Sequence, residues 1–356
     1  MMMMQKKNEI ADTSMLRELS NAIGVSGDEG NVRAIVLEAI REHVDEVTVD
    51  SIGNVLAFKK GTGRQRLRVM LDAHMDEVGL MVVGYTNEGL LRMRTVGGID
   101  ARLLPGTLLK VGPDQMPGVI GVKPIHLADE AERNKVVQIK QLAIDIGAKD
   151  KEEAEKLAPL GTYAAFDTTF REMGSAVSGK AFDDRAGCAA LIALLRGERF
   201  PSDIHAAFTV QEEVGLRGAR VAAYALEPDC AFALEGTIAD DIPKDKDVSP
   251  TTELGKGPAL TVMDRSFIAD RRLLKLLTET ADELDIPYQF KQPGMGGTDA
   301  GAIHLAREGI PSITIAVPCR YIHSQLGLLN LDDFHHTIQL TRESLSRLTR
   351  RILRRN

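Results

Sequence analysis

The pattern of apolar and polar positions predicts a chain that opens with a helix and continues into two strands. Apolar residues at helical spacing follow Ser26-Gly27-Asp28-Glu29, which has the sequence of a capping box, so an amphipathic helix is expected after it. The apolar runs 54–58 and 67–71 indicate strands divided by a Gly-Thr-Gly turn. The second of these strands leads directly to His74.

From about residue 77 to 171 the apolar runs become short and are interrupted by Gly and Pro, as at Gly97-Gly98 and Pro105-Gly106. This texture is typical of a small, tightly turned β domain, here with one short helix over residues 151–157. We therefore predict a β-barrel-like, PDZ-like insertion domain over residues 77–171.

After residue 172 the pattern returns to alternating helices and strands. The predicted helices cover 185–196, 269–284, 299–307 and the C-terminal segment, and the predicted strands cover 204–210, 230–234 and 312–317. Such alternation favours a mostly parallel sheet covered by helices. The expected architecture is an α/β domain over residues 1–76 and 172–356, interrupted by the insertion. Because insertions enter and leave a domain at nearby points, His74 and Asp183 are expected to be neighbours.

Composition narrows the choice of function. The chain has 356 residues, of which 44% are hydrophobic, which allows two domains with substantial cores. A formal net charge of -7 argues against a nucleic-acid or anionic-membrane partner. Three cysteines without a CxxC pair make a disulfide framework unexpected. The N-terminus lacks the apolar core of a signal peptide, so a cytoplasmic location is predicted.

Residues of metal-binding type follow several of the strand-like runs. They are His74, Asp76, Asp183, Glu212, Glu213, Glu235 and His323. In open α/β sheets, ligands bind outside the carboxyl ends of the strands, so one shared site explains these positions better than unrelated loop residues do. Imidazole and carboxylate without thiolate indicate catalytic zinc, cobalt or manganese. Two imidazoles and three carboxylates are more ligands than one four-coordinate ion can bind if it also holds water. Two ions that share one carboxylate would accommodate this number of ligands.

Each motif taken alone has an alternative. His74 is expected to be a ligand that Asp76 orients, although the same pair also suits a surface turn. Asp183 and its neighbour precede a helix, so either can be an ordinary N-cap, or one can cap while the other bridges two metals. Glu212 and Glu213 would repel each other if buried without a cation, which suggests one ligand and one general base, but solvated Glu-Glu pairs are also common.

A glycine-rich loop, Gly294-Met-Gly-Gly-Thr-Asp-Ala300, precedes a predicted helix. It has neither the lysine of a P-loop nor the spacing of a dinucleotide-binding fingerprint. We predict instead that Gly297, Thr298 and Asp299 approach the substrate near the metals.

Five segments together resemble, in order and spacing, the glutamyl aminopeptidase family of cocatalytic metallopeptidases, which includes the tetrahedral (TET) aminopeptidases. They are residues 73–79, 179–185, 211–215, 296–300 and 320–324. The resemblance implies one metal held by His74, Asp183 and Glu235. It implies a second metal held by Asp183, Glu213 and His323, with Glu212 as the general base and Asp76 as the orienting residue. Many relatives have aspartate where this chain has Glu235.

The resemblance also implies a reaction and an assembly. The expected reaction is removal of N-terminal amino acids from peptides with a free N-terminus, using two divalent ions per subunit, zinc first and cobalt or manganese as options. The insertion is expected to mediate homodimer contacts, and the dimers to form a hollow tetrahedral dodecamer.

Three other functions remain open from the residues. A deacylase or carboxypeptidase could use the same two-metal site. A metal-free glycosidase of the endoglucanase type could use the paired carboxylates. The third alternative is a non-catalytic scaffold, but the chain keeps every expected type of metal ligand, which argues against lost chemistry. The side chain preferred at the substrate N-terminus is not predicted by the sequence.

Overall fold

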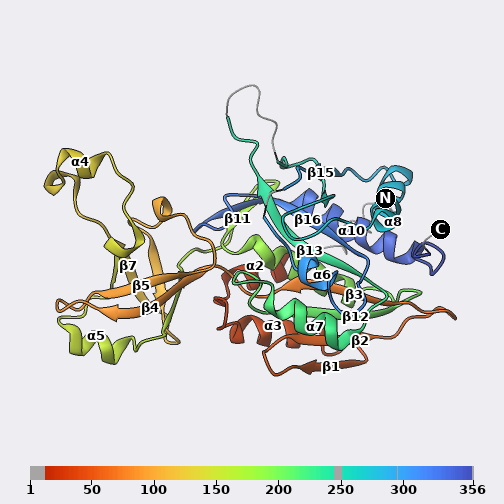
Figure 1. The fold of residues 1–356 in the computed structure, drawn as a ribbon, viewed down its shortest axis with the longest axis horizontal. Coiled ribbons are helices and arrows are strands. Elements are labelled where there is room, and N and C mark those ends of the chain that lie inside the picture. Colours follow the sequence, from red (N-terminus) through yellow and green to blue (C-terminus); the bar gives the residue numbers. More distant parts are fainter. Residues whose placement is uncertain (1–12, 244–250, 295, 355–356) are drawn as a thin grey trace.

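The computed structural model describes residues 13–243, 251–294 and 296–354, in which a barrel projects from one side of a helix-covered sheet (Figure 1). The α/β domain predicted over 1–76 and 172–356 therefore includes residues 1–12, 244–250, 295 and 355–356, which lie outside the described part of the chain.

Eleven of the described strands form one mixed sheet. They are β1 (Glu46–Val49), β2 (Val55–Lys59), β3 (Arg68–His74), β10 (Arg171–Met173), β11 (Ala176–Gly179), β12 (Asp203–Thr209), β13 (Cys230–Ala239), β14 (Ala259–Thr261), β15 (Gln289–Lys291), β16 (Ser312–Arg320) and β17 (Gly327–Asn330). Their order is β1-β2-β12-β3-β13-β16-β17-β11-β10, with β14 and β15 placed beside β16.

The prediction of a mostly parallel sheet is correct only for the centre. Strands β12, β3, β13 and β16 are parallel, and β14 and β15 form one more parallel pair. The remaining pairs in this sheet are antiparallel. Consecutive strands such as β1–β2, β10–β11 and β16–β17 are joined by short connections, which suit antiparallel pairing because a parallel pair needs a long crossover.

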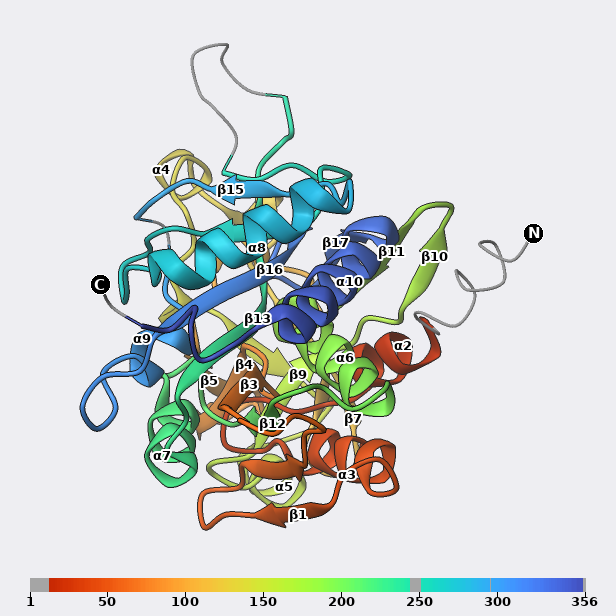
Figure 2. The ribbon, with the colours of Figure 1, turned by 90° about the vertical axis from the view of Figure 1, so that its right-hand side faces the viewer.

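Helices cover both faces of the sheet (Figure 2). They are α2 (Thr13–Asn21), α3 (Gly30–Ile40), α6 (Phe182–Arg196), α8 (Arg271–Glu283) and α10 (Leu331–Arg347) on one face, and α7 (Arg217–Leu226) and α9 (Ala300–Ile303) on the other. In β3, Leu71 belongs to the larger core cluster under α3 and α6, and Met70 to the cluster under α7 and α9. This alternation follows from the two-residue period of a strand.

Several boundaries differ from the prediction. Helix α2 was not predicted, and α9 is shorter than the expected 299–307. Strand β13 continues to Ala239, so Glu235 lies inside a strand rather than after it, because β13 pairs with β16 as far as Ala239 opposite Arg320.

The predicted capping box does not form. Helix α3 begins at Gly30 without a side-chain cap. The Ser26 hydroxyl instead donates to Asp76 Oδ2 over 2.6 Å, and Glu29 Oε1 accepts from the backbone N–H of Gln211 over 3.3 Å. A hydrogen bond to a charged group stabilises by about 1.5–3 kcal/mol, more than the roughly 1 kcal/mol of an N-cap, so the tertiary partner prevails.

Six of the described strands close into a barrel in the order β4-β5-β8-β7-β6-β9. They are β4 (Gly79–Tyr85), β5 (Leu91–Val96), β6 (Leu108–Val111), β7 (Met116–Gly121), β8 (Ala143–Asp145) and β9 (Tyr163–Phe166), accompanied by η1 (Ala101–Leu103), η2 (Ile125–Leu127), α4 (Glu130–Arg133), η3 (Ile139–Gln141) and α5 (Lys151–Leu157). The barrel has its own apolar core, which includes Leu80, Ile120 and Ile144. The barrel-like shape agrees with the prediction, whereas the PDZ-like relationship and the limits 77–171 stay predictions.

A buried group of three charges joins the barrel to the sheet domain. Glu77, just before β4, accepts from Lys180 Nζ over 2.6 Å and from Arg185 Nη2 over 3.2 Å. All three side chains are at most 2% exposed. Lys180 and Arg185 also donate hydrogen bonds to backbone carbonyl oxygens. These bonds give partners to N–H groups that are removed from water by burial. We call these residues the Glu77 triad.

All three cysteines are buried and free. Within the described ranges, no helix has the length and apolar character needed to cross a bilayer. The cytoplasmic location stays a prediction.

Candidate metal centre

The predicted site residues come together at the carboxyl ends of the central parallel strands. His74 ends β3, Glu212 and Glu213 follow β12, Glu235 lies in β13, and His323 follows β16. With Asp183 at the start of α6, they line one cavity of about 560 Å³. The convergence follows from the fold, because parallel neighbours end at the same edge of a sheet.

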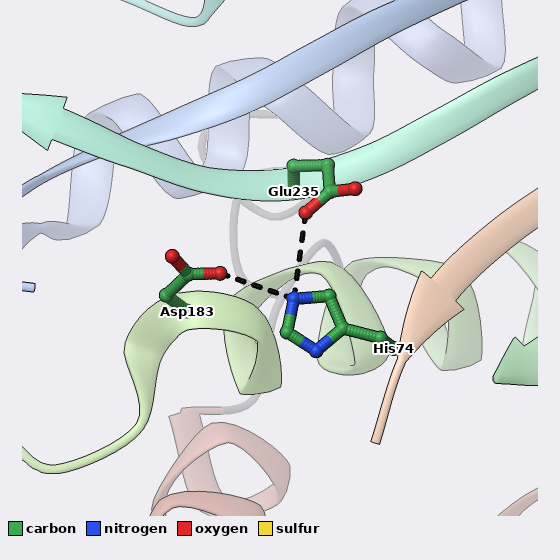
Figure 3. Close-up of side chains that lie close together, drawn as sticks. All are labelled: His74, Asp183 and Glu235. Carbon is green, nitrogen blue, oxygen red and sulfur yellow. Dashed lines mark hydrogen bonds and ion pairs between the residues drawn. The ribbon is translucent and has the colours of Figure 1, made fainter. Parts of the chain in front are cut away.

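His74, Asp183 and Glu235, here called the inner group, approach one another from three different elements (Figure 3). His74 Nε2 lies 3.2 Å from Asp183 Oδ1 and 3.6 Å from Glu235 Oε2. One ligand atom from each residue lies within 4.8 Å of the others. The side chains of His74 and Glu235 are only 1% and 3% exposed, and that of Asp183 is 13% exposed.

Asp183, Glu213 and His323 form a second group, here called the outer group. His323 Nε2 lies 3.4 Å from Asp183 Oδ2 and 3.4 Å from Glu213 Oε1. The His323 side chain is 37% exposed. Asp183 therefore turns one carboxylate oxygen to each histidine, which is the geometry that a carboxylate shared by two ions needs.

Both histidines hold their second ring nitrogen away from the cluster. His74 Nδ1 lies 3.2 Å from the Asp76 carbonyl oxygen and 3.4 Å from its carboxylate, while His323 Nδ1 lies 2.8 Å from the Gly98 carbonyl oxygen. Such contacts fix the tautomer that leaves Nε2 free to bind a metal. Gly98 belongs to the barrel, in the loop after β5, and the sequence marked it only as a break between apolar runs, not as part of the site.

Asp76 also positions the two glutamates after β12. Its carboxylate accepts the backbone N–H of Glu212 over 3.0 Å and of Glu213 over 3.2 Å, in addition to the Ser26 hydroxyl. One buried acid thus fixes a histidine ring and the backbone of the Glu-Glu pair together.

Asp183 and Asp184 have different partners, although they are adjacent and joined by a cis peptide bond. Asp184 accepts the backbone N–H of Gly187 over 2.9 Å and of His74 over 3.1 Å, so it caps the helix and holds the end of β3. Asp183 faces the two histidines. The sequence left open which aspartate caps the helix. In the structure Asp184 caps it, and Asp183 is directed into the site.

The backbone around the site requires a glycine and holds strained residues. A Cβ on Gly236 would lie 2.8 Å from Asp183 Cα, so only glycine lets β13 pass this close to the start of α6. Gln211 and His323 adopt left-handed conformations with φ of 56° and 58°. Backbone strain of this kind persists where surrounding contacts enforce it.

The electrostatics of the cluster favour cations. Burial raises the pKa of Glu212 well above its usual value and, against the opposing charge of His323, that of Glu213 to about 7. Burial alone would lower the pKa of His323, but its hydrogen bond with Asp183 and the nearby Glu213 carboxylate raise it to about 10. Burial would likewise raise the pKa of Asp183, yet hydrogen bonds from both histidines hold it below its usual range.

These shifts arise because several carboxylates share a small volume with only two imidazoles. Divalent cations would neutralise that charge, and the oxygen and nitrogen donors without thiolate suit catalytic rather than closed structural zinc. The residues present therefore fit two divalent ions.

The glycine-rich loop lies at the edge of the cavity. Gly297 and Thr298 line the cavity, whereas Asp299 is fully buried and does not. The Asp299 backbone N–H donates to Glu235 Oε1 over 3.1 Å, and its carboxylate accepts the Thr209 hydroxyl over 2.6 Å. The Asp299 side chain is therefore held by Thr209 while its backbone supports Glu235, and the substrate contacts of this loop stay a prediction.

With this geometry described, comparison with known proteins identifies the family. The model of the M42 glutamyl aminopeptidase family matches residues 53–340. The chain belongs to this M42 family. The M42 chain is 38% identical over 332 residues to a putative aminopeptidase of Acetivibrio thermocellus, covering 93% of this chain and 97% of that one. It is 35% identical over 352 residues to the lysyl aminopeptidase of Pyrococcus furiosus, covering 95% and 98%.

Two solved structures of TET peptidases have the same fold. A TET aminopeptidase from a marine sediment archaeon of the Thaumarchaeota superposes with a TM-score of 0.91 at 38% identity, covering 96% of this chain and 98% of that one. The Pyrococcus horikoshii TET1 peptidase, which can assemble into a tetrahedron or a large octahedral shell, gives 0.82 at 34% identity, covering 93% and 98%. The protein is a peptide hydrolase. The family is described as glutamyl, whereas one similar protein is a lysyl aminopeptidase, so these comparisons leave the preferred N-terminal residue undecided.

Proposed function

We propose that this M42 protein is an aminopeptidase that uses two divalent metal ions per subunit, zinc being the expected metal. The inner and outer groups would each hold one ion, with Asp183 as the shared ligand. The observation that carries the proposal is the split of the Asp183 carboxylate, with Oδ1 at 3.2 Å from His74 and Oδ2 at 3.4 Å from His323. When bound, the ions would polarise the scissile carbonyl and lower the pKa of water.

Glu212 is the proposed general base. It belongs to neither metal-binding group, and its Oε2 lies 3.9 Å from His74 Nε2 in the same cavity. Burial raises its pKa, which brings the carboxylate closer to the range in which it can take a proton near neutral pH. Glu212 would accept a proton from the attacking water and return it to the leaving amine.

The excess of carboxylates also supports a preference for a free N-terminus. A substrate α-ammonium entering the cavity would meet acidic groups, whereas an acylated amine would bring no charge and more bulk. This favours an aminopeptidase over a deacylase.

We further propose that the barrel mediates homodimer contacts and that dimers assemble into a tetrahedral dodecamer. Support comes from apolar side chains exposed on the barrel, which are Val122, Ile125, Leu127 and Val136, from 46% to 70% exposed. Val122, Ile125 and Val136 line one surface cavity, and apolar groups gathered on a surface are typical of contact sites between proteins. The mass of the protein in solution tests this assembly.

The catalytic proposal is tested with the metal-depleted protein after addition of zinc, cobalt or manganese. We expect cleavage of aminoacyl amides, no cleavage of N-acetylated ones, and loss of activity on chelation. Glu212→Gln should lower kcat by about 10²–10⁴-fold while metal content stays at two per subunit. The matched control is Glu198→Gln on an exposed residue, which should leave both unchanged.

Three results would oppose the proposal. Full cleavage of aminoacyl amides after exhaustive chelation would rule out the metal-dependent mechanism. Cleavage of blocked amines alone would indicate a deacylase. Unchanged hydrolysis in Glu212→Gln would remove the assigned base.

A further inference from the structure

The outer-group residue His323 belongs to a loop with an unusual backbone. The loop covers residues 321–326, between β16 and β17. Tyr321 and His323 both adopt left-handed conformations, with φ of 62° and 58°. Residues other than glycine rarely occupy this region, and they stay there only where surrounding contacts enforce it. The position of the His323 ring therefore depends on the contacts that hold this loop.

Contacts inside the loop provide part of this support. Ser324 Oγ lies 2.6 Å from the Tyr321 carbonyl oxygen and accepts the backbone N–H of Leu326 over 3.2 Å. These hydrogen bonds shape the turn itself. They do not join the turn to other elements, so they do not set the distance between the His323 ring and Asp183.

Three residues of the predicted insertion join this loop to the rest of the molecule. The Gly98 carbonyl oxygen lies 2.8 Å from His323 Nδ1. The Thr168 hydroxyl donates to the Gln325 carbonyl oxygen over 2.6 Å. Thr107 Oγ1 lies 2.5 Å from Gln325 Oε1, which makes this the side-chain contact between the barrel and the loop. The loop that carries an outer-group histidine is thus held from the side of the barrel.

Thr107 is a rigid anchor for this contact. It lies between η1 and β6 and is 5% exposed. Its backbone N–H donates to the Leu104 carbonyl oxygen over 3.1 Å, and its carbonyl oxygen accepts the N–H of Ile120 over 3.0 Å. Thr107 Oγ1 also lies 2.9 Å from the Leu103 carbonyl oxygen. Because a hydroxyl both donates and accepts, as does an amide, Thr107 can bond Leu103 and Gln325 together.

The barrel backbone also lies directly against two residues of the outer group. A Cβ on Gly98 would lie 3.3 Å from His323 Nδ1, and a Cβ on Gly97 would lie 3.3 Å from Glu213 Cβ. Gly97 has a φ of 82°, which glycine adopts without strain. The barrel therefore packs against the outer group at close range, and a shift of the loop relative to the barrel would change the geometry of the group.

We propose that Thr107 is a positioning residue for the outer ion, acting through Gln325 on His323. The inference rests on the proposed two-metal function and adds a residue to it. Within the described residues, Thr107 neither lines the cavity nor belongs to a metal-binding group. Loss of its hydroxyl would let the loop relax from its left-handed conformation. The ion would then have to order the His323 ring on binding, which lowers its affinity.

The test titrates zinc into the metal-depleted, full-length protein in competition with a fluorescent chelator and measures the affinity of each ion separately. The ion whose binding His323→Ala weakens most is the outer one. In Thr107→Val this ion should bind about 3- to 10-fold more weakly, the loss expected for one neutral hydrogen bond, while the other ion keeps its affinity. Gln325→Leu should have the same effect, and the double variant should be no weaker than either single one. Thr107→Ser restores the hydroxyl and should keep the parent affinity.

A purely structural role for Thr107 gives a different pattern. A lowered Tm with an equal loss of affinity for both ions would overturn the inference. Thr95→Val is the matched control, because it removes a hydroxyl from β5 of the same barrel at a separate cavity and should leave both affinities as in the parent protein. If Thr107→Val does not fold, Gln325→Leu decides, since Gln325 is exposed: an unchanged outer ion in that variant overturns the inference.

The same titration separates this inference from the proposed function. If the parent protein binds two ions and the outer one has equal affinity in Thr107→Val and Gln325→Leu, the role of Thr107 is overturned and the two-metal proposal stands. If the parent protein binds fewer than two ions, the two-metal proposal is overturned and this inference with it. Selective weakening of the outer ion that Thr107→Ser reverses supports both.

Discussion

The inner and outer groups share Asp183 but are built from different parts of the molecule. His74 and Glu235 of the inner group lie in central strands and are at most 3% exposed. His323 of the outer group follows a strand, is 37% exposed, and is oriented by the barrel residue Gly98. The inner group is thus part of the core of the sheet domain, whereas the outer group is completed by the insertion.

The difference has a consequence for metal binding. Ligands fixed in a packed core lose little entropy on binding and are shielded from chelators. A ligand on an exposed segment is ordered by fewer contacts and is reached by solvent. We therefore expect the inner ion to bind more tightly and exchange more slowly than the outer one.

The largest effect is expected from removing the shared ligand. Asp183→Asn weakens both groups at once and should lower kcat/KM by about 10³-fold or more, which corresponds to the several kcal/mol that metal ions contribute. Plasma mass spectrometry should find fewer than one metal per subunit. Asp114→Asn on an exposed residue is the control. Retention of one tightly bound metal would show that the two groups do not depend on Asp183 equally.

Replacing one histidine at a time tests the ranking directly. His323→Ala should reduce metal content from two ions to one and lower kcat/KM by about 10²-fold, because one of three ligands to the outer ion is removed. His74→Ala should reduce the content further, since the inner group is expected to hold the tighter ion. Metal content after dialysis against increasing chelator measures this, and an equal loss from the two variants would contradict the ranking.

The outer ion should also depend on pH. In the metal-free protein the pKa of Glu213 is raised to about 7 and that of His323 to about 10, so both carry protons at low pH. Protons and metal compete for the same atoms, so lower pH weakens binding. Between pH 7 and 10 the affinity for the second zinc equivalent should rise about tenfold per pH unit, as His323 loses one proton. Competition with a fluorescent chelator measures the slope, and a flat profile would contradict it.

The smallest effect is expected from the orienting acid of the inner group. Asp76→Asn keeps the shape but weakens the contact with His74 Nδ1 and the hydrogen bond from Ser26. Replacing such a partner typically costs about 10–100-fold in metal affinity or activity. Zinc titration should show this loss at the inner ion. A loss confined to the outer ion would mean that Asp76 acts mainly through the Glu213 backbone.

The sequence predicted the part of the site that depends on regular patterns. Apolar runs of strand length placed His74, Glu213 and His323 at strand ends, and parallel strands bring such ends together. The short runs broken by Gly and Pro predicted the barrel. The mixed edges of the sheet were missed because the alternation of helices and strands does not report how the outer strands pair.

The supporting contacts were not predictable for a physical reason. Ser26 reaches Asp76 across 50 positions, and Gly98 reaches His323 across 225. Neither contact leaves a periodic trace, and the local alternative for Ser26, a capping box, looked complete by itself.

The Glu77 triad connects the barrel to the start of α6, where Asp183 lies. Glu77 leads into the barrel, and Arg185 lies two positions beyond Asp183 at the start of α6. Displacing the barrel would have to break buried ion pairs, at about 3–5 kcal/mol for the loss of a buried partner, or shift the first turn of α6. Force applied to the barrel would therefore reach Asp183, the carboxylate that we propose as the shared ligand of the two ions. In an assembled particle, neighbouring subunits that brace the barrel would act as a mechanical lock on the metal spacing.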